Sequence, residues 1–167
     1  MPHIVAARSD EDIAAVTALA WQFVAFLHDR YPERAAQLDS YLKGQRFAEM
    51  LGDFRKHFNP PKGECMLARL DGTPVGIVML KPVRRDLCEM NRMYVVPAAR
   101  GHGIGRALCD ALIAEARSLG YLEMRLGALD RHIEALPLYR SLGFSDDPDP
   151  PAHARGDPGV ICLRLTL

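Results

Sequence analysis

Apolar and polar positions recur along the chain with two different periods, and the period distinguishes helices from strands. Apolar residues three or four apart mark helical segments, whereas alternating or continuous β-branched runs mark strands. The pattern predicts the following elements: a strand at 3–8, a helix from 10 to about 27, a second helix at roughly 36–57, a hairpin at 64–83, a strand at 88–96, a helix at 104–119, a strand at 122–129, a short helix at 132–144 and a terminal strand at 160–167.

Local signals indicate where several of these elements begin and end. Ser9 or Asp10 is the expected N-cap of the first helix, because short polar side chains accept hydrogen bonds from the first helical amides. The Asp-Gly pair at 71–72, between two β-rich runs, predicts a tight hairpin turn. Gly120 is expected to end the helix before it, and Pro137 must lie in the first turn of its short helix to be tolerated.

The order of these elements predicts the fold class. Strands outnumber helices, and both hairpins and strand–helix–strand units occur. We therefore expect a mixed α/β sheet with helices on both faces. At 167 residues, without an internal repeat or a linker, the chain is expected to form a single domain over 1–167.

Charge and hydropathy exclude some classes of partner. The chain has 21 basic and 21 acidic side chains, and this balance argues against a surface built for nucleic acid. The longest apolar stretch, at 13–27, is shorter than the roughly 20 residues that span a bilayer, so no membrane partner is expected. The N-terminus shows no secretory signal, and a cytoplasmic location is expected.

The cysteines are spread widely, with no C-x-x-C pair and no clustered histidines beside them. This spacing predicts buried free thiols in a reducing compartment, with neither a disulfide framework nor a metal site. The four are Cys65, Cys88, Cys109 and Cys162.

The stretch "RGHGIGRA" at 100–107 joins a predicted strand to a predicted helix and carries glycine at three alternate positions. The first amides of a helix have no intrahelical acceptor, and the helix dipole adds partial positive charge there. Glycines let these amides approach a phosphate, and nearby basic side chains add charge. The loop therefore predicts an anion site, most simply for the pyrophosphate of a nucleotide-like cofactor. A tight turn without a ligand is the alternative.

Two common phosphate motifs do not match this loop. A P-loop requires Lys and Ser or Thr where the chain has Arg106 and Ala107. The dinucleotide fingerprint requires a third glycine where the chain again has Arg106.

A third pattern does match. The segment "RGHGIG" at 100–105 resembles the R/Q-x-x-G-x-G/A signature of the GNAT N-acetyltransferase superfamily. The similarity extends through the Val-x-Pro turn at 95–97 to "EALPLYRSLGF" at 134–144, which resembles the closing helix and strand of that family. The two motifs cover about 88–144 in the family's order and spacing.

The resemblance implies a fold and a cosubstrate. The fold would be a mixed sheet of about six to seven strands with helices on both faces, and acetyl-CoA would lie in a V-shaped opening between the parallel strands at 88–96 and 122–129. The pyrophosphate would be held by the glycine loop, and the pantetheine arm would pair with the preceding strand. The implied cofactor-binding residues are Met93, Tyr94, Val95, Arg100, Gly101, His102, Gly103, Ile104, Gly105, Arg106, Tyr139 and His132, which stands where the family often has Asn.

The resemblance also implies a reaction and its catalytic residues. Transfer of an acetyl group to an amine needs a base near pH 7, and Glu89 matches the carboxylate that some members use, directly or through water. A structural ion pair is the alternative for Glu89. Other members carry an acid where this chain has Gly127, so Asp130 is the fallback. Tyr139 matches the tyrosine that protonates the leaving thiolate. No basic partner adjoins Cys88 or Cys109, so a cysteine acyl-enzyme is not expected.

The leading hypothesis is thus an acetyl-CoA:amine N-acetyltransferase that works by direct attack in a ternary complex, without a metal. The alternative is a catalytically silent acyl-CoA-binding regulatory module, and a nucleotide-dependent oxidoreductase is disfavoured by the failed fingerprint. A homodimer is a family-level expectation.

The acceptor stays open between amino acid, polyamine, aminoglycoside and protein amines. Its site is expected in the helix pair at 10–57 and the loop at 145–159. The candidate contacts there are Trp21, Phe26, His28, Tyr31, Tyr41 and Arg155.

Overall fold

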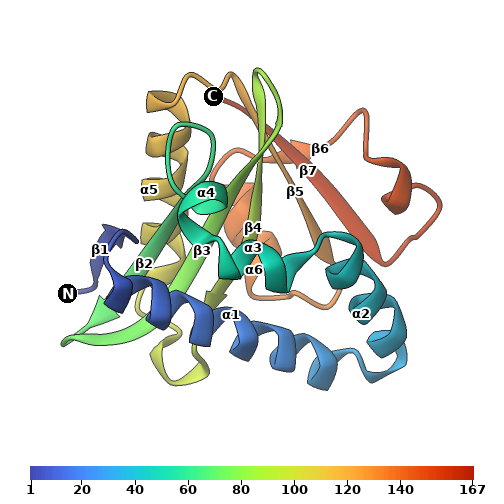
Figure 1. Cartoon of the computed structure of the whole chain (residues 1–167). Coiled ribbons are helices and arrows are strands. Elements are labelled where there is room, and N and C mark those ends of the chain that lie inside the picture. The colour runs from blue at the N-terminus through green and yellow to red at the C-terminus, as the bar shows by residue number, and fades with distance from the viewer.

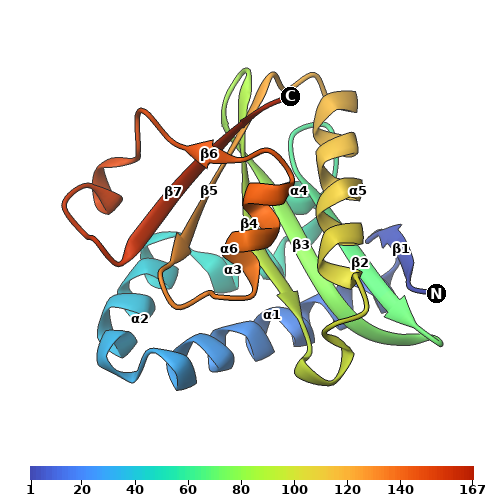
Figure 2. The same ribbon diagram turned by 180° about the vertical axis from the view of Figure 1, so that it is seen from behind.

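A computed structural model describes all residues, 1–167, as a seven-stranded sheet with helices on both faces (Figure 1; Figure 2). The strands are β1 (His3–Ala6), β2 (Glu64–Leu70), β3 (Thr73–Arg84), β4 (Leu87–Val95), β5 (Glu123–Leu129), β6 (Ser145–Asp146) and β7 (Val160–Thr166). The α-helices are α1 (Asp10–Arg30), α2 (Ala35–Gly44), α3 (Phe47–Gly52), α4 (Phe54–Phe58), α5 (Ile104–Ser118) and α6 (Ala135–Ser141). Short 3-10 turns occur at Pro32–Arg34, Pro97–Ala99 and Ala152–Ala154.

The strand order is β1-β2-β3-β4-β5-β7-β6, and every neighbouring pair is antiparallel except β4 and β5. The parallel pair is short. Its register runs from Leu87 opposite Glu123 to Glu89 opposite Arg125 and ends there. Beyond this point the two strands separate, which confirms the expected V-shaped opening in the sheet.

The central strands are buried on both faces, and alternate residues enter two separate cores. On β3, Val78 and Leu80 join the core beneath α5, whereas Ile77 and Met79 join the core beneath α1 to α4. Figure 1 shows α1 in front of the sheet, and Figure 2 shows α5 and α6 covering the opposite face. The predicted arrangement of helices on both faces is therefore confirmed.

The first helix begins as predicted, with Ser9 as its N-cap. The Ser9 hydroxyl accepts a hydrogen bond from the Asp12 amide at 3.1 Å, and the Asp12 carboxylate accepts one from the Ser9 amide at 3.4 Å. This reciprocal capping box satisfies two amides that have no intrahelical acceptor. The predicted hairpin turn also forms, with both Asp71 and Gly72 at positive φ.

The single helix expected at 36–57 is wrong, because α2, α3 and α4 occupy this region as separate short helices. The chain leaves the helical conformation at Arg46, whose φ is 55°, and again at Asp53, whose φ is −120° and ψ is 53°. The apolar spacing continues across both breaks, since all three helices pack their apolar sides on the same core. Periodicity alone could not detect the interruptions.

Two smaller predictions need correction. The loop after α6 contains β6, two residues that pair with β7 through Ser145 and Asp146, which the polar composition of this segment did not indicate. The cysteines are free thiols, but Cys162 is only partly buried, whereas the other three are buried as predicted. No helix is both long and apolar enough to cross a membrane, and no cluster of three potential metal ligands occurs among His, Cys, Asp and Glu.

Candidate functional site

Two cavities meet where β4 and β5 separate. The glycine-loop cavity, of about 380 Å³, lies between β4, β5, α5 and α6 and includes the loop at 100–106. The helix-pair cavity, of about 440 Å³, lies between α1, α2, β4, β5 and β7. Seven residues line both cavities: Phe23, Asn91, Arg92, Leu126, Gly127, Ala128 and His132. A molecule in one cavity can therefore reach a molecule in the other through the opening in the sheet.

Two glycines of the loop adopt a backbone conformation that favours glycine. Gly101 and Gly103 adopt φ of 82° and 76°, a region that side chains with a Cβ rarely occupy. The first backbone bond of α5 runs from the Ala107 amide to the Gly103 carbonyl at 3.0 Å. The three amides before Ala107, at residues 104–106, consequently have no intrahelical acceptor. They form a donor set with partial positive charge at the start of a 15-residue helix.

The third glycine of the loop has a different role. A Cβ built on Gly105 would lie 3.4 Å from a Leu138 methyl group and 3.6 Å from the Met93 sulfur. Gly105 thus keeps the floor of the cavity open where α5, α6 and β4 approach one another. The cavity walls beside the amides are apolar, whereas the amides themselves supply the polarity that a phosphate requires.

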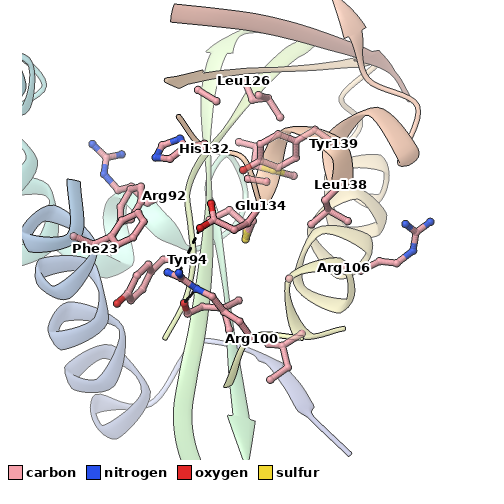
Figure 3. Close-up of a pocket in the computed structure, with 18 of the residues that line it drawn as sticks. Phe23, Arg92, Tyr94, Arg100, Arg106, Leu126, His132, Glu134, Leu138 and Tyr139 are labelled. Atoms are coloured by element: carbon pink, nitrogen blue, oxygen red, sulfur yellow. Dashed lines mark hydrogen bonds and ion pairs between the residues drawn. The ribbon is translucent and has the colours of Figure 1, made fainter. Parts of the chain in front are cut away.

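The basic side chains of the loop take three different orientations. The Arg100 Nε donates to the Val95 carbonyl at 2.9 Å, and its Nη1 lies 3.7 Å from the Glu134 carboxylate. The His102 ring bonds the Ala99 carbonyl and does not line the cavity. Arg106 lines the cavity at the start of α5, with its guanidinium directed away from the centre and bonded to Ser141 (Figure 3).

The edge of β4 offers backbone groups to a ligand. The Val96 amide donates to the Val75 carbonyl on β3 at 2.9 Å. Because polar groups alternate between the two sides of an antiparallel strand, the amide and carbonyl of Val95 face the opening toward β5. The Val95 carbonyl already accepts the Arg100 side chain, so its amide is the group left for a strand-like ligand.

Met93 and Tyr94, the other two residues predicted on this edge, also line the glycine-loop cavity. The Tyr94 ring packs against Phe23 and Phe26 of α1, with ring centroids 5.6 Å and 5.9 Å apart. These contacts close the end of the cavity that faces α1.

Tyr139 lies on α6 and is 6% exposed, packed edge-on against Phe144. Its hydroxyl points into the glycine-loop cavity (Figure 3). Burial raises the pKa of this phenol well above its usual value, so the hydroxyl stays protonated at neutral pH. A protonated phenol beside a cavity is suited to donate a proton or a hydrogen bond to an anionic leaving group.

His132 lies at the junction of the two cavities, stacked on Phe26 with a ring separation of 6.4 Å. Burial, with the positive charge of Arg30, lowers its pKa to about 4, so the imidazole is neutral at pH 7. Its Nε2 atom is buried and has no hydrogen-bond partner within the protein. A buried ring nitrogen without a partner fits a hydrogen bond to a polar group of a bound ligand.

A group of ion pairs holds the end of α1 to the loop between β5 and α6. Arg30 donates two hydrogen bonds of 2.8 Å to the Glu134 carboxylate, and Arg131 pairs with Glu33. Hydrogen bonding from Arg30, helped by Arg100, lowers the pKa of Glu134 to about 2. In this group of ion pairs, which we call the clasp, Glu134 lines the glycine-loop cavity and also pairs with Arg100 (Figure 3).

Glu89 lines the helix-pair cavity and not the glycine-loop cavity. It is 9% exposed, accepts a hydrogen bond from Asn91 at 3.0 Å, and pairs with Arg125 at 3.3 Å. Glu89 is thus ion-paired, as the structural alternative expects, and it also faces a cavity, as a catalytic base must. The fallback acid, Asp130, lines neither cavity.

A β-bulge in β4 determines which side chains surround Glu89. Ile77 pairs with Tyr94 and Met79 pairs with Asn91, so two residues of β4 stand opposite one residue of β3. The extra residue is Arg92, whose φ is 50°. Because of the bulge, Asn91 and Arg92 both line the helix-pair cavity, although strict alternation would direct them to opposite faces.

Sequence reasoning missed the cationic residues of this cavity. Arg92 and Arg125 line it, and Lys81 stands opposite Glu89 on the neighbouring strand. The alternation of β5 could have placed Arg125 on the face of Gly127, two residues along. Arg92 gave no such signal, because its orientation depends on a bulge that only the pairing with β3 defines.

Of the six predicted acceptor contacts, two line a cavity and four do not. Tyr41 lines the helix-pair cavity, and Phe26 lines the glycine-loop cavity. The other four, Trp21, His28, Tyr31 and Arg155, line neither cavity.

The site geometry agrees with what comparisons with known proteins show. Residues 20–144 match the model of the acetyltransferase (GNAT) family. The chain belongs to this family of acetyltransferases. The same comparison accounts for the glycine loop and for the closing helix that carries Tyr139, since both lie within the matched residues.

Relatives and solved structures support the assignment. An uncharacterised N-acetyltransferase of Schizosaccharomyces pombe is 36% identical over 121 residues, 71% of this chain and 72% of the relative. A GNAT-family acetyltransferase structure from Staphylococcus aureus has a TM-score of 0.73 at 16% identity, covering 100% of this chain and 99% of the other. The paia N-acetyltransferase of Thermoplasma acidophilum, solved with coenzyme A, has a TM-score of 0.70 at 18% identity, with coverage of 100% and 99%. These structures share the fold, and the relatives support an acyltransferase.

Proposed function

We propose that the protein transfers the acetyl group of acetyl-CoA to a primary amine of a small molecule or peptide, by direct attack in a ternary complex. The observation that carries the proposal is the meeting of the two cavities at the gap between β4 and β5. Acetyl-CoA is assigned to the glycine-loop cavity and the amine to the helix-pair cavity, so that the thioester and the nitrogen meet in the gap.

The residues of the glycine-loop cavity fit the parts of acetyl-CoA. The free amides at the start of α5 suit the pyrophosphate, and the Val95 amide suits the pantetheine arm. The unpartnered Nε2 of His132 provides a hydrogen bond where the family often has an asparagine. Arg100 contributes by shaping the rim, because its guanidinium is engaged by Val95 and Glu134.

The proposed reaction balances without a covalent enzyme intermediate. The amine nitrogen attacks the thioester carbonyl carbon, and a backbone amide of the β4 edge stabilises the oxyanion. The C–S bond then breaks, and the Tyr139 hydroxyl gives its proton to the leaving thiolate. Glu89, directly or through water, takes the proton that the ammonium group loses before the attack. When the tetrahedral intermediate collapses, its nitrogen loses a second proton, which returns through water to the Tyr139 phenolate. The buried thiols of Cys88 and Cys109 take no part, since burial raises the pKa of each to about 12.

The first test is thermal unfolding with acetyl-CoA, NADH and ATP, each at saturation. A ligand at 100 times its Kd stabilises a protein by about 2.7 kcal/mol, and we expect this stabilisation with acetyl-CoA alone. Stabilisation by NADH or ATP instead would contradict the assigned cosubstrate. Release of free CoA thiol in the presence of amines then measures turnover. Acetyl-CoA binding without thiol release from any amine would assign the silent binding module instead.

A further inference from the structure

The helix-pair cavity has an uneven charge distribution. Glu89 is the only carboxylate that lines it, whereas the three arginines that line it are Arg34, Arg92 and Arg125. Arg34 is neutralised by Asp157 at 3.1 Å, and Arg125 is paired with Glu89. Arg92 has no carboxylate partner.

A neighbouring lysine adds further positive charge at this end of the cavity. Lys81 stands opposite Glu89 in the pairing of β3 with β4, so three cations surround one carboxylate. The histidine at the junction, His132, is neutral at pH 7, so the positive charge here comes from the arginines and Lys81. A polycationic acceptor would be repelled here, since like charges brought together at low dielectric are costly.

Arg92 is held in position and still has hydrogen-bonding capacity. Its guanidinium stacks 4.0 Å above the Phe47 ring and donates to the side chains of Gln45 and Asn91. A guanidinium has five donors, so the remaining ones are available to a ligand. The planar fork favours a carboxylate, because two parallel hydrogen bonds form at once.

Half of the residues that line the cavity are hydrophobic, although Gln37, Ser40 and His153 line it as well. The apolar lining includes Val24, Leu27, Leu38 and Leu129. The volume of about 440 Å³ exceeds what a carboxylate and an amine alone would fill. An occupant with an apolar body therefore matches this cavity better than a fully polar one.

We propose that the acceptor is a small amine that carries a carboxylate and an apolar body, such as an apolar amino acid, with its carboxylate bound by Arg92. This inference rests on the proposed transfer to an amine and specifies its substrate class. The amine nitrogen then lies toward Glu89 and the gap at Gly127, which has open space where a Cβ would stand. Arg92 is a specificity residue in this assignment.

The test compares acceptors that differ only in the carboxylate. The pairs are L-leucine with L-leucinamide and L-phenylalanine with L-phenylalaninamide, and spermidine is the polycationic probe. We expect a kcat/KM for the free acids about tenfold to a hundredfold above that for the amides, the worth of charged hydrogen bonds. The amides have the lower amine pKa and hence more free base at pH 7, so intrinsic reactivity works against this result.

Substitutions show whether Arg92 causes the preference. Arg92→Gln is expected to remove it by raising KM for the acids only, and Arg92→Lys is expected to restore part of it. The control is Lys43→Gln, which removes one positive charge from exposed α2 outside the cavity. An equal preference for amides or spermidine, or an equal loss for all acceptors in Arg92→Gln, would overturn the inference.

The experiments distinguish a failure of the carboxylate inference from a failure of the proposed acetyl transfer. If acetyl-CoA stabilises the protein and amides or polyamines turn over, only the carboxylate inference fails. If acetyl-CoA neither binds nor reacts, the proposed function fails. If no amine in the panel turns over, calorimetry with CoA and N-acetyl-L-leucine or N-acetyl-L-phenylalanine decides, since carboxylate binding that Arg92→Gln weakens supports the inference and no binding contradicts it.

Discussion

The two cavities that meet at the gap in the sheet are built in different ways. The glycine-loop cavity takes its polarity from the backbone, through the free amides of α5 and the edge of β4. Apart from Phe23 and Phe26, its lining residues come from two stretches of chain, 90–106 and 126–139. The helix-pair cavity takes its polarity from charged side chains on β4, β5 and the 3-10 turn at Pro32–Arg34. A backbone site suits a ligand common to a whole family, whereas a side-chain site can change its ligand by single substitutions.

The largest effect is expected from Tyr139→Phe, which removes only a hydroxyl. A group that transfers a proton contributes about 10²- to 10⁴-fold, so we expect kcat to fall about a hundredfold or more while the KM for acetyl-CoA stays the same. Steady-state assays of thiol release measure both. Tyr121→Phe is the matched control, because its buried hydroxyl bonds the Lys62 carbonyl, outside both cavities. Unchanged kcat in Tyr139→Phe would remove the proton donor from the mechanism.

Glu89→Gln tests whether the carboxylate in the helix-pair cavity acts as the general base. If the carboxylate takes the ammonium proton, kcat/KM at pH 7 falls by about 10²-fold, the lower end of general base contributions. The deficit should narrow as the pH rises toward the amine's own pKa, because more of the acceptor is then already neutral. A pH profile from 6.5 to 10 measures this. A constant deficit across the profile would assign Glu89 to holding Arg125 and not to proton transfer.

Gly103→Ala tests whether backbone conformation defines the glycine-loop cavity. A Cβ at this positive φ costs roughly 1–2 kcal/mol, and it would lie beside the proposed phosphate. We expect the Kd for acetyl-CoA to rise by about tenfold, measured by calorimetry, with the KM for the amine unchanged. Gly120→Ala is the control, since Gly120 has φ of 91° and open space around it at the other end of α5. An equal Kd in the two variants would show that the loop does not contact the cosubstrate.

The smallest effect is expected from Glu134→Gln in the clasp. The pKa of Glu134 is about 2 in the folded protein against 4.5 as its ordinary value, so its contribution to stability is present above pH 4.5 and is lost as the pH falls toward 2. Its side chain is 44% exposed, so solvent screening limits the contribution to about 1 kcal/mol or less.

The substitution should therefore lower Tm by a few degrees at pH 7 and by less at pH 3. Thermal unfolding at both values checks the sign, with Glu49→Gln in an exposed ion pair as the control. A larger loss at pH 3 would contradict the assigned cause.

The contrast between the cavities also explains what the sequence could predict. The glycine loop, the hairpin turn at 71–72 and the helix around Tyr139 were all predicted, because each depends on residues adjacent in the chain. The place of Arg92 in the helix-pair cavity was not predicted, because strict alternation from Glu89 puts Asn91 and Arg92 on opposite faces of the sheet. Only the bulge in the pairing of β3 with β4 reveals that Asn91 and Arg92 both line the helix-pair cavity.

The helix pair was predicted less accurately for a related reason. The apolar spacing over 36–57 records which residues face the core, but it does not record the left-handed turn at Arg46 that separates α2 from α3. That turn places Gln45 and Phe47 on either side of the guanidinium of Arg92. The position of Arg92, on which the proposed acceptor specificity rests, thus depends on long-range contacts that no local pattern contains.

The short parallel register between β4 and β5 has a consequence for the order of events. Only three residue pairs join these strands before they separate, so the sheet divides the two cavities except at this one gap. In the proposed reaction, each reactant occupies its own cavity, and the two meet only at this gap. If the proposed function holds, CoA and the acetylated product would leave from opposite sides of the gap, so that product release would need no fixed order.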